Sequence, residues 1–318
     1  MRRILSWVAL TLSCAVSVAQ AQQYPDHPVR VFVGYAAGSG PDIQARTVAH
    51  QLSISLGQSF VVENRTGANG TIAARTVAQS NPDGYTLLFS SSSITPTPYI
   101  YKALGYDILI DLKPISTIGI LDGIFMLVDA KSPIKTMPEF IAYAKKNRVM
   151  YGSPGVGNEL HLVTELFSQQ AGIKMEHVPY KGASEVMTGL LSGSVQVMFV
   201  TPPSVMGLIK DGRVRPLAFT GSKQFAPFPN VPLMKDFLPN FTHGSWGMFF
   251  APGKTSDPII EKLNVAVYAA LREPAVANVM QHDGYFPDNR NATETAAFFR
   301  QAVKEAEGAV KAAGIQPN

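Results

Sequence analysis

Short hydrophobic runs alternate with amphipathic segments through the first hundred residues. The stretches with strand or helix character are, in chain order, 29–35, 42–57, 59–64, 71–80 and 85–90. In segment 42–57 apolar residues recur three or four positions apart, the spacing that places side chains on one face of a helix. The resulting order, β-α-β-α-β, predicts a parallel sheet covered by helices on both faces.

The same alternation starts again in the middle of the chain. After an apolar run at 123–131, segments with helix or strand character follow at 137–147, 149–155, 159–172, 174–180, 183–193 and 195–200. A further run, "SWGMFFAP" (245–252), precedes helical segments at 257–272, 274–282 and 293–313, with no strong strand after them. Helices without a sheet of their own must pack on an existing one, so we expect this C-terminal part to return to the first unit.

These patterns predict two α/β lobes. The first lobe would contain 22–125 and 249–318, and the second 126–248. The chain would cross between them at "FMLVDA" and at "WGMFFA". Two-lobed proteins of this kind close over a ligand by bending at such crossings.

Residues 1–21 have the features of a cleavable signal peptide. Arg2 and Arg3 precede an apolar stretch, and "AQA" at 19–21 is a small-x-small cleavage motif. The stretch is too short to span a bilayer. Cys14 as a lipoprotein anchor is the competing interpretation, but Leu is absent from the third position before it. We therefore expect an exported protein.

Composition excludes several classes of protein. The formal net charge is +4 and the basic residues are scattered, which argues against nucleic-acid binding. Cys14 is the single cysteine and lies in the predicted signal peptide, so the mature chain would lack disulfides and thiol nucleophiles. The six histidines lack metal-ligand spacing. We expect no metal and no cofactor.

Three junctions between a strand and a helix share one design. They are "GYAAGSGPD" (34–42), "YGSPGVGNELH" (151–161) and "FVTPPSVMGLI" (199–209). Free N–H groups at a helix start, together with the helix dipole, attract an anion. In parallel sheets, ligands bind beyond the carboxyl ends of the strands. The hydroxyls of "SSSS" at 90–93 add further donors at a fourth strand end. The sequence therefore predicts a small anionic ligand held by neutral donors.

Other motifs for chemistry are not supported. The first junction has the spacing G-x-x-x-G-x-G instead of the dinucleotide pattern, and neither a P-loop nor a G-x-S-x-G elbow occurs. His161, in the first turn after the second junction, either contacts the ligand or holds the loop backbone. Asp42 either accepts from a ligand amine or holds its own loop, with Arg46 as its structural partner.

Several longer stretches resemble one known family. They are "YPDHPVRVFVGYAAGSGPDIQAR", "LGQSFVVENRTGANGTIAARTVAQSNPDGYTLL", "YGSPGVGNELHLVTELF", "HVPYKGASEVMTGLLSGSVQVMF", "DGRVRPLAFT" and "WGMFFAP". They cover nearly all of the mature chain, and "VVENRTGANG" and "PDGYTLL" are the most specific. The sequence resembles the Bug (TctC-like) family of periplasmic solute-binding receptors, which serve tripartite tricarboxylate transporters.

The resemblance implies an α/β protein of the type II periplasmic-binding-protein fold, with two α/β lobes joined by two crossing strands and the ligand in the interlobe cleft. It implies small carboxylate ligands: dicarboxylates, tricarboxylates, acidic amino acids or aromatic acids. Backbone amides, hydroxyls and bridging water would hold the carboxylate, often without a salt bridge.

The resemblance also implies a set of ligand-binding residues. The matching positions are Tyr35, Ala37, Gly38, Ser39 and Asp42 in the first loop, Ser91 and Ser92 after the "YTLL" strand, Ser153, Gly155, Val156 and Gly157 in the second-lobe loop, His161 behind that loop, and Thr201 after "VQVMFV". The usual first loop reads G-G-x-x-D, whereas Ser39 and Pro41 intervene here. This difference would change which acid fits, and the ring of Tyr35 keeps aromatic acids among the candidates.

We therefore expect a periplasmic, monomeric, non-enzymatic receptor that closes over a carboxylate and is recognised by the membrane components of a transporter. A sensory co-receptor that presents the bound acid to a membrane histidine kinase is an alternative that the sequence does not separate from transport. A secreted hydrolase is the alternative of another class.

Overall fold

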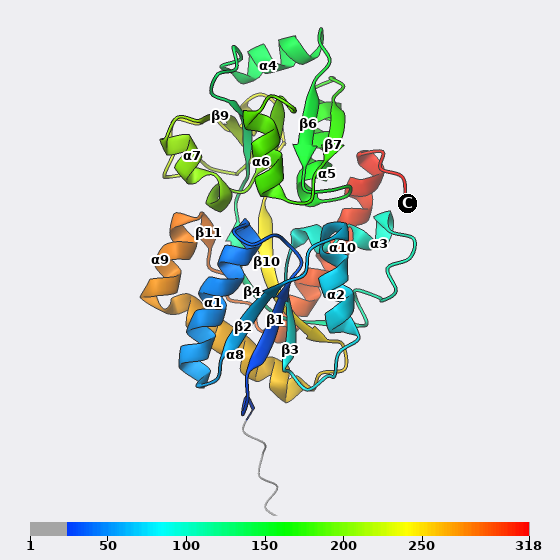
Figure 1. Cartoon of the computed structure of the whole chain (residues 1–318), viewed down its shortest axis with the longest axis vertical. Coiled ribbons are helices and arrows are strands. Elements are labelled where there is room, and N and C mark those ends of the chain that lie inside the picture. Colours follow the sequence, from blue (N-terminus) through cyan, green and yellow to red (C-terminus); the bar gives the residue numbers. More distant parts are fainter. Residues whose placement is uncertain (1–23, 318) are drawn as a thin grey trace, which may run out of the picture.

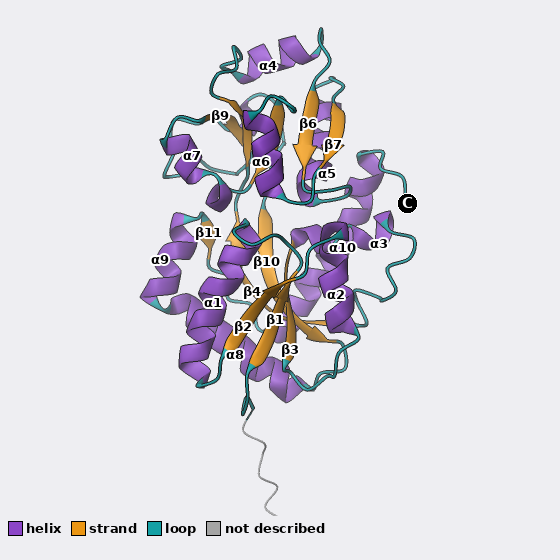
Figure 2. Cartoon of the chain, in the orientation of Figure 1, coloured by secondary structure: helices purple, strands orange, loops and turns teal. Residues whose placement is uncertain are grey.

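The structure is a computed structural model that describes residues 24–317; the predicted signal peptide, with Cys14, lies outside the described residues. Two lobes lie one above the other along the long axis of the molecule (Figure 1). Each consists of one sheet with helices packed on both of its faces (Figure 2).

The first lobe contains a six-stranded sheet with the order β11-β4-β10-β3-β1-β2. Its strands are β1 (Val29–Val33), β2 (Phe60–Asn64), β3 (Thr86–Ser91), β4 (Leu112–Leu121), β10 (Ser245–Pro252) and β11 (Tyr285–Phe286). β1 is parallel to β2 and β3, as the sequence predicts. β10 runs antiparallel to β3 and β4, so the complete sheet is mixed.

Helices cover both faces of this sheet, and alternate side chains along a strand pack against the helices on opposite faces. The first-lobe helices are α1 (Gly40–Leu56), α2 (Thr71–Ala78), α3 (Thr97–Ile100), α8 (Asp257–Arg272), α9 (Pro274–His282) and α10 (Ala292–Ala312). Val31 and Val33 belong to the buried cluster that includes α1, α8 and α9, whereas Phe32 packs with α2 and α10. The C-terminal helices therefore return to the first lobe, as predicted.

The second lobe contains a five-stranded sheet with the order β7-β6-β8-β5-β9. Its strands are β5 (Phe125–Asp129), β6 (Met150–Ser153), β7 (Glu176–Pro179), β8 (Val197–Val200) and β9 (Val214–Phe219), and its helices are α4 (Met137–Ala144), α5 (Glu159–Gln170), α6 (Ala183–Leu191) and α7 (Met206–Lys210). Residues of α4 and α5 pack on one face, and residues of α6 and α7 on the other. Short 3₁₀ helices are η1 (Ala68–Gly70), η2 (Ser92–Ile94), η3 (Pro202–Ser204) and η4 (Met234–Asp236).

The crossings between the sheets lie outside the segments predicted for them. "FMLVDA" contains β5 of the second sheet, and "WGMFFA" lies within β10 of the first sheet. Residue 125 therefore belongs to the second sheet and residues 245–248 to the first, which differs from the predicted lobe boundaries. Both runs are apolar because they are central strands covered on two faces.

The chain actually crosses at 122–124 and within 220–244. The two crossings are hydrogen-bonded to each other at Asp122 and at Thr220. Thr220 Oγ1 accepts from the Ile124 amide at 2.9 Å and donates to the His243 carbonyl at 2.6 Å. The hinge is therefore a paired segment and not two independent linkers.

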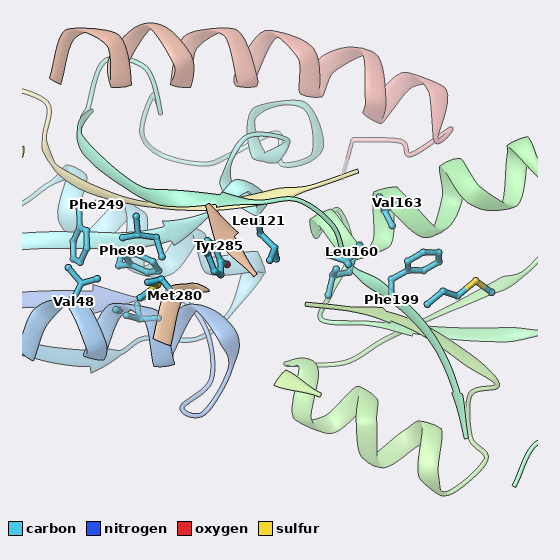
Figure 3. Packing of buried hydrophobic residues seen from close by; sticks show 14 of the residues in the cluster. Val48, Phe89, Leu121, Leu160, Val163, Phe199, Phe249, Met280 and Tyr285 are labelled. Carbon is cyan, nitrogen blue, oxygen red and sulfur yellow. The ribbon is translucent and has the colours of Figure 1, made fainter. Parts of the chain in front are cut away.

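One buried cluster runs through both lobes. Figure 3 shows Phe89 and Phe249 of the first lobe, Leu121 beside the first crossing, and Leu160 and Phe199 of the second lobe; all are buried members of this cluster. A continuous core thus connects the two lobes beside the crossings.

Three strands of the structure are absent from the sequence prediction: β4, β9 and the two-residue β11. β4 is interrupted by Pro114, Ser116 and Gly119, so its apolar residues form neither a continuous run nor a clean alternation. β9 contains Arg215 and Pro216, which hide its strand character in the same way.

Candidate functional site

A cavity of about 570 Å³ lies between the lobes, where the strands of both sheets end. Its lining is Gly34, Tyr35, Ala36, Ser39, Gly40, Pro41, Gln44, Thr66, Gly67, Ala68, Asn69, Gly70, Ser91, Ser93, Tyr101, Pro154, Gly155, Val156, Asn158, Glu159, Leu160, Tyr180, Lys181, Gly182, Ala183, Val200, Thr201, Ser204, Ser245 and Tyr285. Among these residues, Lys181 and Glu159 are the only ones with a formally charged side chain. Neutral polar groups and apolar surface make up the rest.

The start of α1 lines this cavity and carries an unused hydrogen-bonding group. Ser39 is the N-cap residue, but its side chain makes no capping hydrogen bond. It is 6% exposed, and its Oγ is among the few buried side-chain oxygens of residues 24–317 with no partner. A buried hydroxyl without a partner is unfavourable unless a ligand or water completes it. This position is therefore suited to an external acceptor.

The start of α6 faces the same cavity from the second lobe. Its N-cap is Gly182, which has no side chain to cap the first turn. A Cβ built on Gly182 would lie 3.3 Å from Ala36 Cβ, and one built on Gly40 would lie 3.0 Å from Thr201 Oγ1. The lobes therefore approach each other closely at these points, and two helix starts from opposite lobes converge on one space.

The start of α5 differs because protein groups already occupy its amides. The Gly157 amide donates to His161 Nδ1 at 2.9 Å, and the Leu160 amide donates to Asn158 Oδ1 at 2.9 Å. The Glu159 amide donates to Ser93 Oγ of the first lobe at 3.3 Å. These contacts fix the turn and leave those three amides without a free N–H for an anion.

Side chains from the first lobe hold the same turn from the other side. Asn158 Nδ2 donates to Asn69 Oδ1 at 2.9 Å, and Asn69 Nδ2 donates to the Gly157 carbonyl at 3.3 Å. Tyr101 OH donates to the Val156 carbonyl at 3.2 Å. The turn before α5 is therefore part of the seam between the lobes.

His161 belongs to a buried aromatic cluster and holds the backbone of the loop before α5. Its ring stacks on His177 with centroids 3.9 Å apart, and His177 Nε2 lies 2.6 Å from Ser153 Oγ. Burial lowers the pKa of His161 to about 3 and that of His177 to about 4. Both rings are thus neutral at ordinary pH, which leaves His161 Nδ1 able to accept from the Gly157 amide.

Asp42 also holds its own loop. Its carboxylate accepts from the Gly38 amide at 2.9 Å, from Arg46 Nε at 3.1 Å and from Asn64 Nδ2 at 2.7 Å. Burial acts to raise the pKa of Asp42, but these hydrogen bonds outweigh it and lower the pKa. The charged carboxylate thereby fixes the loop that carries Ser39.

Tyr35 and the serines after β3 form a hydroxyl network on the first-lobe side. Ser91 Oγ donates to Tyr35 OH at 3.0 Å, and Tyr35 OH lies 3.3 Å from Ser90 Oγ. Ser92 Oγ instead lies 2.8 Å from Ser245 Oγ, toward the hinge. Tyr35 and Ser91 line the cavity, and Ser92 supports its hinge end.

The family model described as the tripartite tricarboxylate transporter family receptor matches residues 44–315. The chain belongs to this receptor family. Its recognition from the motifs in the sequence is therefore confirmed.

Individual relatives and solved structures agree with this assignment. Protein BugT of Bordetella pertussis is 32% identical over 323 residues, covering 99% of this chain and 99% of that protein. The structure of the periplasmic binding protein BugD has a TM-score of 0.88 and 29% identity, covering 93% of this chain and 100% of that one. The predicted fold, with two α/β lobes of the periplasmic-binding-protein type, is confirmed.

Two solved structures of similar proteins contain carboxylates. Rpa4515 of R. palustris, with adipate, has a TM-score of 0.88 and 30% identity, covering 93% of this chain and 100% of that one. MatC from Rhodopseudomonas palustris, with bound malate, has a TM-score of 0.84 and 26% identity, covering 90% of this chain and 100% of that one. The family and these neighbours support a solute-binding role for this receptor.

The residues predicted for the receptor's site divide into two groups. Those that line the cavity are Tyr35, Ser39, Ser91, Gly155, Val156 and Thr201, and those outside its lining are Ala37, Gly38, Asp42, Ser92, Ser153, Gly157 and His161. The second group includes residues that brace the two loops through the hydrogen bonds described above. Contact of any of them with a ligand remains a prediction.

Sequence reasoning missed two loops that line the receptor's cavity. Residues 66–70 follow β2, and residues 180–183 follow β7. "VVENRTGANG" already stood out as a specific motif, and "YKGA" is a strand–helix junction like those considered. Glu159, Ser245 and Tyr285 carry no local signal, because the fold alone brings them to the hinge end of the cavity.

Proposed function

We propose that this chain is a periplasmic receptor that binds a small carboxylate between its lobes and presents it, in the closed form, to the membrane components of a tripartite tricarboxylate transporter. The observation that carries the proposal is the buried, unpartnered Oγ of Ser39, a residue at the uncapped start of α1 that lines the cavity which the start of α6 also faces. Exposed amides at helix starts favour an anion.

Closure follows from the placement of these groups on different lobes. A carboxylate that contacts both Ser39 and the Gly182 end of α6 makes those contacts together only when the lobes are close. A ligand shifts a conformational equilibrium by its difference in affinity for the two states, so such an anion favours the closed form. The closed form is the state that a transporter would recognise.

The ligand class rests on the neutral donors of the cavity and on the family. The related structures with adipate and malate support small aliphatic acids. The cavity volume of about 570 Å³ and the ring of Tyr35 also leave room for an aromatic acid. We propose no sensory role, since no feature of the described residues favours it over transport.

A binding role without catalysis is part of the proposal. Ser153 Oγ and His177 Nε2 are within hydrogen-bond distance, as a nucleophile and its base would be. However, Ser153 is fully buried and lies outside the cavity lining, and its hydroxyl is also 3.0 Å from the Gly155 carbonyl. This pair shapes the loop before α5.

The periplasmic location rests on the family and on the predicted signal peptide. Among residues 24–317, no helix combines the length and the apolar character that crossing a bilayer requires. A fusion of residues 1–21 to a reporter that is active only after export would test the signal directly.

A thermal-shift screen of the mature protein against aliphatic and aromatic carboxylic acids tests the function. We expect at least one acid to raise the melting temperature in a concentration-dependent way, because binding to the folded state alone stabilises it. The matched primary amides of the same acids serve as controls and should not raise it. If no acid stabilises the protein, or if the amides act equally well, the proposal is wrong.

A further inference from the structure

The charge inside the cavity is not uniform. Glu159, at the start of α5, is the one carboxylate among the residues that line the cavity, and its side chain is 9% exposed. A buried carboxylate beside an anion-binding space opposes the anion unless the ligand also offers it a donor. The presence of Glu159 therefore indicates that the ligand carries a hydrogen-bond donor in addition to its carboxylate.

Glu159 is held in place at the hinge. Its Oε2 accepts from Ser245 Oγ at 2.8 Å, and its Oε1 lies 3.1 Å from His243 Nε2. Ser245 starts β10 in the first sheet, and His243 lies in the second crossing, so the carboxylate is fixed by groups outside its own helix. A carboxylate accepts about four hydrogen bonds, so these two partners leave acceptor capacity.

A polar wall connects Glu159 with the start of α1. A Cβ built on Gly40, next to Ser39, would lie 3.7 Å from Gln44 Nε2, and Gln44 Nε2 donates to Tyr285 OH at 2.5 Å. Tyr285 and Ser245 flank the same residue, Leu121 of β4, in register. The wall therefore has a hydroxyl and helix amides at one end and a carboxylate at the other.

The electrostatics of the tyrosines agree with this placement. Burial raises the pKa of Tyr285, and the nearby Glu159 raises it further. Burial also raises the pKa of Tyr35, hydrogen bonds with Ser90 and Ser91 act to lower it, and Glu159 makes the smallest contribution, which raises it. Both hydroxyls therefore stay protonated at ordinary pH, and the negative charge of Glu159 interacts with both.

We infer that Glu159 is a second recognition point of the cavity, for a hydroxyl or ammonium group that the ligand carries apart from the carboxylate held near Ser39. The receptor would then select hydroxy acids or amino acids over the corresponding unsubstituted acids. This inference rests on the proposed function and narrows its ligand class. The unpartnered Ser39 Oγ supplies the anion end independently of Glu159.

The test compares matched acids in the wild-type protein and in Glu159→Gln by calorimetry. The probes are succinate, malate and aspartate, then glutarate and 2-hydroxyglutarate, then benzoate and 4-hydroxybenzoate. We expect the wild type to bind the preferred donor-bearing acid at least about tenfold more tightly than its unsubstituted partner, since a buried acceptor left without a donor is costly. Malate against aspartate shows whether the donor is a hydroxyl or an ammonium group.

In Glu159→Gln, two affinities should move in opposite directions. The donor-bearing acid should bind more weakly, because its charged acceptor is gone, and the unsubstituted acid should bind more tightly, because the repulsion is gone. A merely structural role of Glu159 would weaken both. Glu165→Gln, on the same helix but outside the cavity lining, should keep the wild-type ratio.

The outcomes separate this inference from the proposed function. If the wild type binds unsubstituted acids at least as well as all their substituted partners, or if Glu159→Gln keeps the preference, Glu159 has no recognition role and the receptor proposal stands. If no acid binds at all, both are wrong.

Discussion

The starts of α1 and α5 follow the same kind of glycine-rich turn, but they differ in whether protein groups already pair with their hydrogen-bonding groups. At α5 the Asn158 side chain accepts from the Leu160 amide, His161 accepts from the Gly157 amide, and Ser93 of the other lobe accepts from a third amide. At α1 the N-cap Ser39 makes no such bond, and its Oγ has no partner within the described residues. We therefore propose that the turn before α1, where the protein leaves a donor free, binds the ligand, and that the turn before α5 does not.

The start of α6 resembles that of α1 in this respect. Gly182 offers no side-chain cap, and it sits opposite Ala36 across the interlobe space. One free helix start from each lobe thus faces the cavity, while the third start joins the lobes. The following variants test this division of roles, beginning with the largest expected effect.

Gly182→Asp should reduce carboxylate affinity by about a hundredfold or more. The new side chain would accept from the first amides of α6 and would place a negative charge beside the bound anion; repulsion of about 3 kcal/mol corresponds to this factor. Calorimetry measures the change. The matched control is Gly182→Asn, which has nearly the same shape and caps a helix equally well but carries no charge.

Gly182→Asn should lose much less affinity than the aspartate variant. Equal losses in both variants would mean that bulk against Ala36 blocks closure, and that charge at α6 has no part in binding.

Ser39→Ala should weaken binding by about tenfold while stabilising the empty protein by about 1 kcal/mol. The first effect follows from the loss of one hydrogen bond to a charged ligand, and the second from the removal of a buried hydroxyl without a partner. Calorimetry and urea unfolding give the two quantities.

Thr295→Val is the control for Ser39→Ala. It removes another buried hydroxyl without a partner, from α10, outside the cavity lining. It should raise stability and leave affinity unchanged. If Ser39→Ala behaves in the same way, Ser39 is not a ligand group.

The α5 turn should make the protein less stable in mild acid. Burial depresses the pKa of His161 from 6.5 to about 3 in the folded protein. Between these two pH values the unfolded chain binds a proton that the folded protein does not. The free energy of unfolding is therefore unaffected by His161 above pH 6.5 and falls as the pH is lowered toward 3. Between pH 7.5 and 5.5 this amounts to about 1 kcal/mol of unfolding free energy. In urea unfolding, His161→Gln should remove that part of the pH dependence; an unchanged profile would show that folding does not depress the pKa of His161.

The smallest effect concerns the exposed Lys181 at the cavity. Exposed charges are screened by salt and by water, so Lys181→Gln should lower affinity by only about twofold, and added salt should act as weakly. If added salt lowers the carboxylate affinity of the wild type tenfold or more, a cation and not the neutral donors holds the anion.

The sequence predicts most of the fold because its parallel strands are covered on both faces and appear as continuous apolar runs. It does not predict β4 and β9, where prolines and polar residues interrupt the pattern. It also misplaces the crossings, because the apolar character of β5 and β10 reports burial and not position relative to the hinge.

The site is less predictable than the fold. Local motifs indicate loops that line the cavity, as at Ser39 and Gly155, but they cannot show whether a donor is already paired. Gly157 illustrates this limit: its amide is bound to His161, and a Cβ there would lie 2.2 Å from Ile100. Long-range neighbours such as Glu159 and Ser245 become visible only in three dimensions.

The most direct test of the central claim is a crystal structure of the protein with a carboxylate that binds it. We predict a closed molecule in which a carboxylate oxygen lies within about 3.2 Å of Ser39 Oγ and the same carboxylate contacts the start of α6 directly or through one water. A carboxylate bound at the turn before α5, or outside the interlobe cavity, would contradict the account.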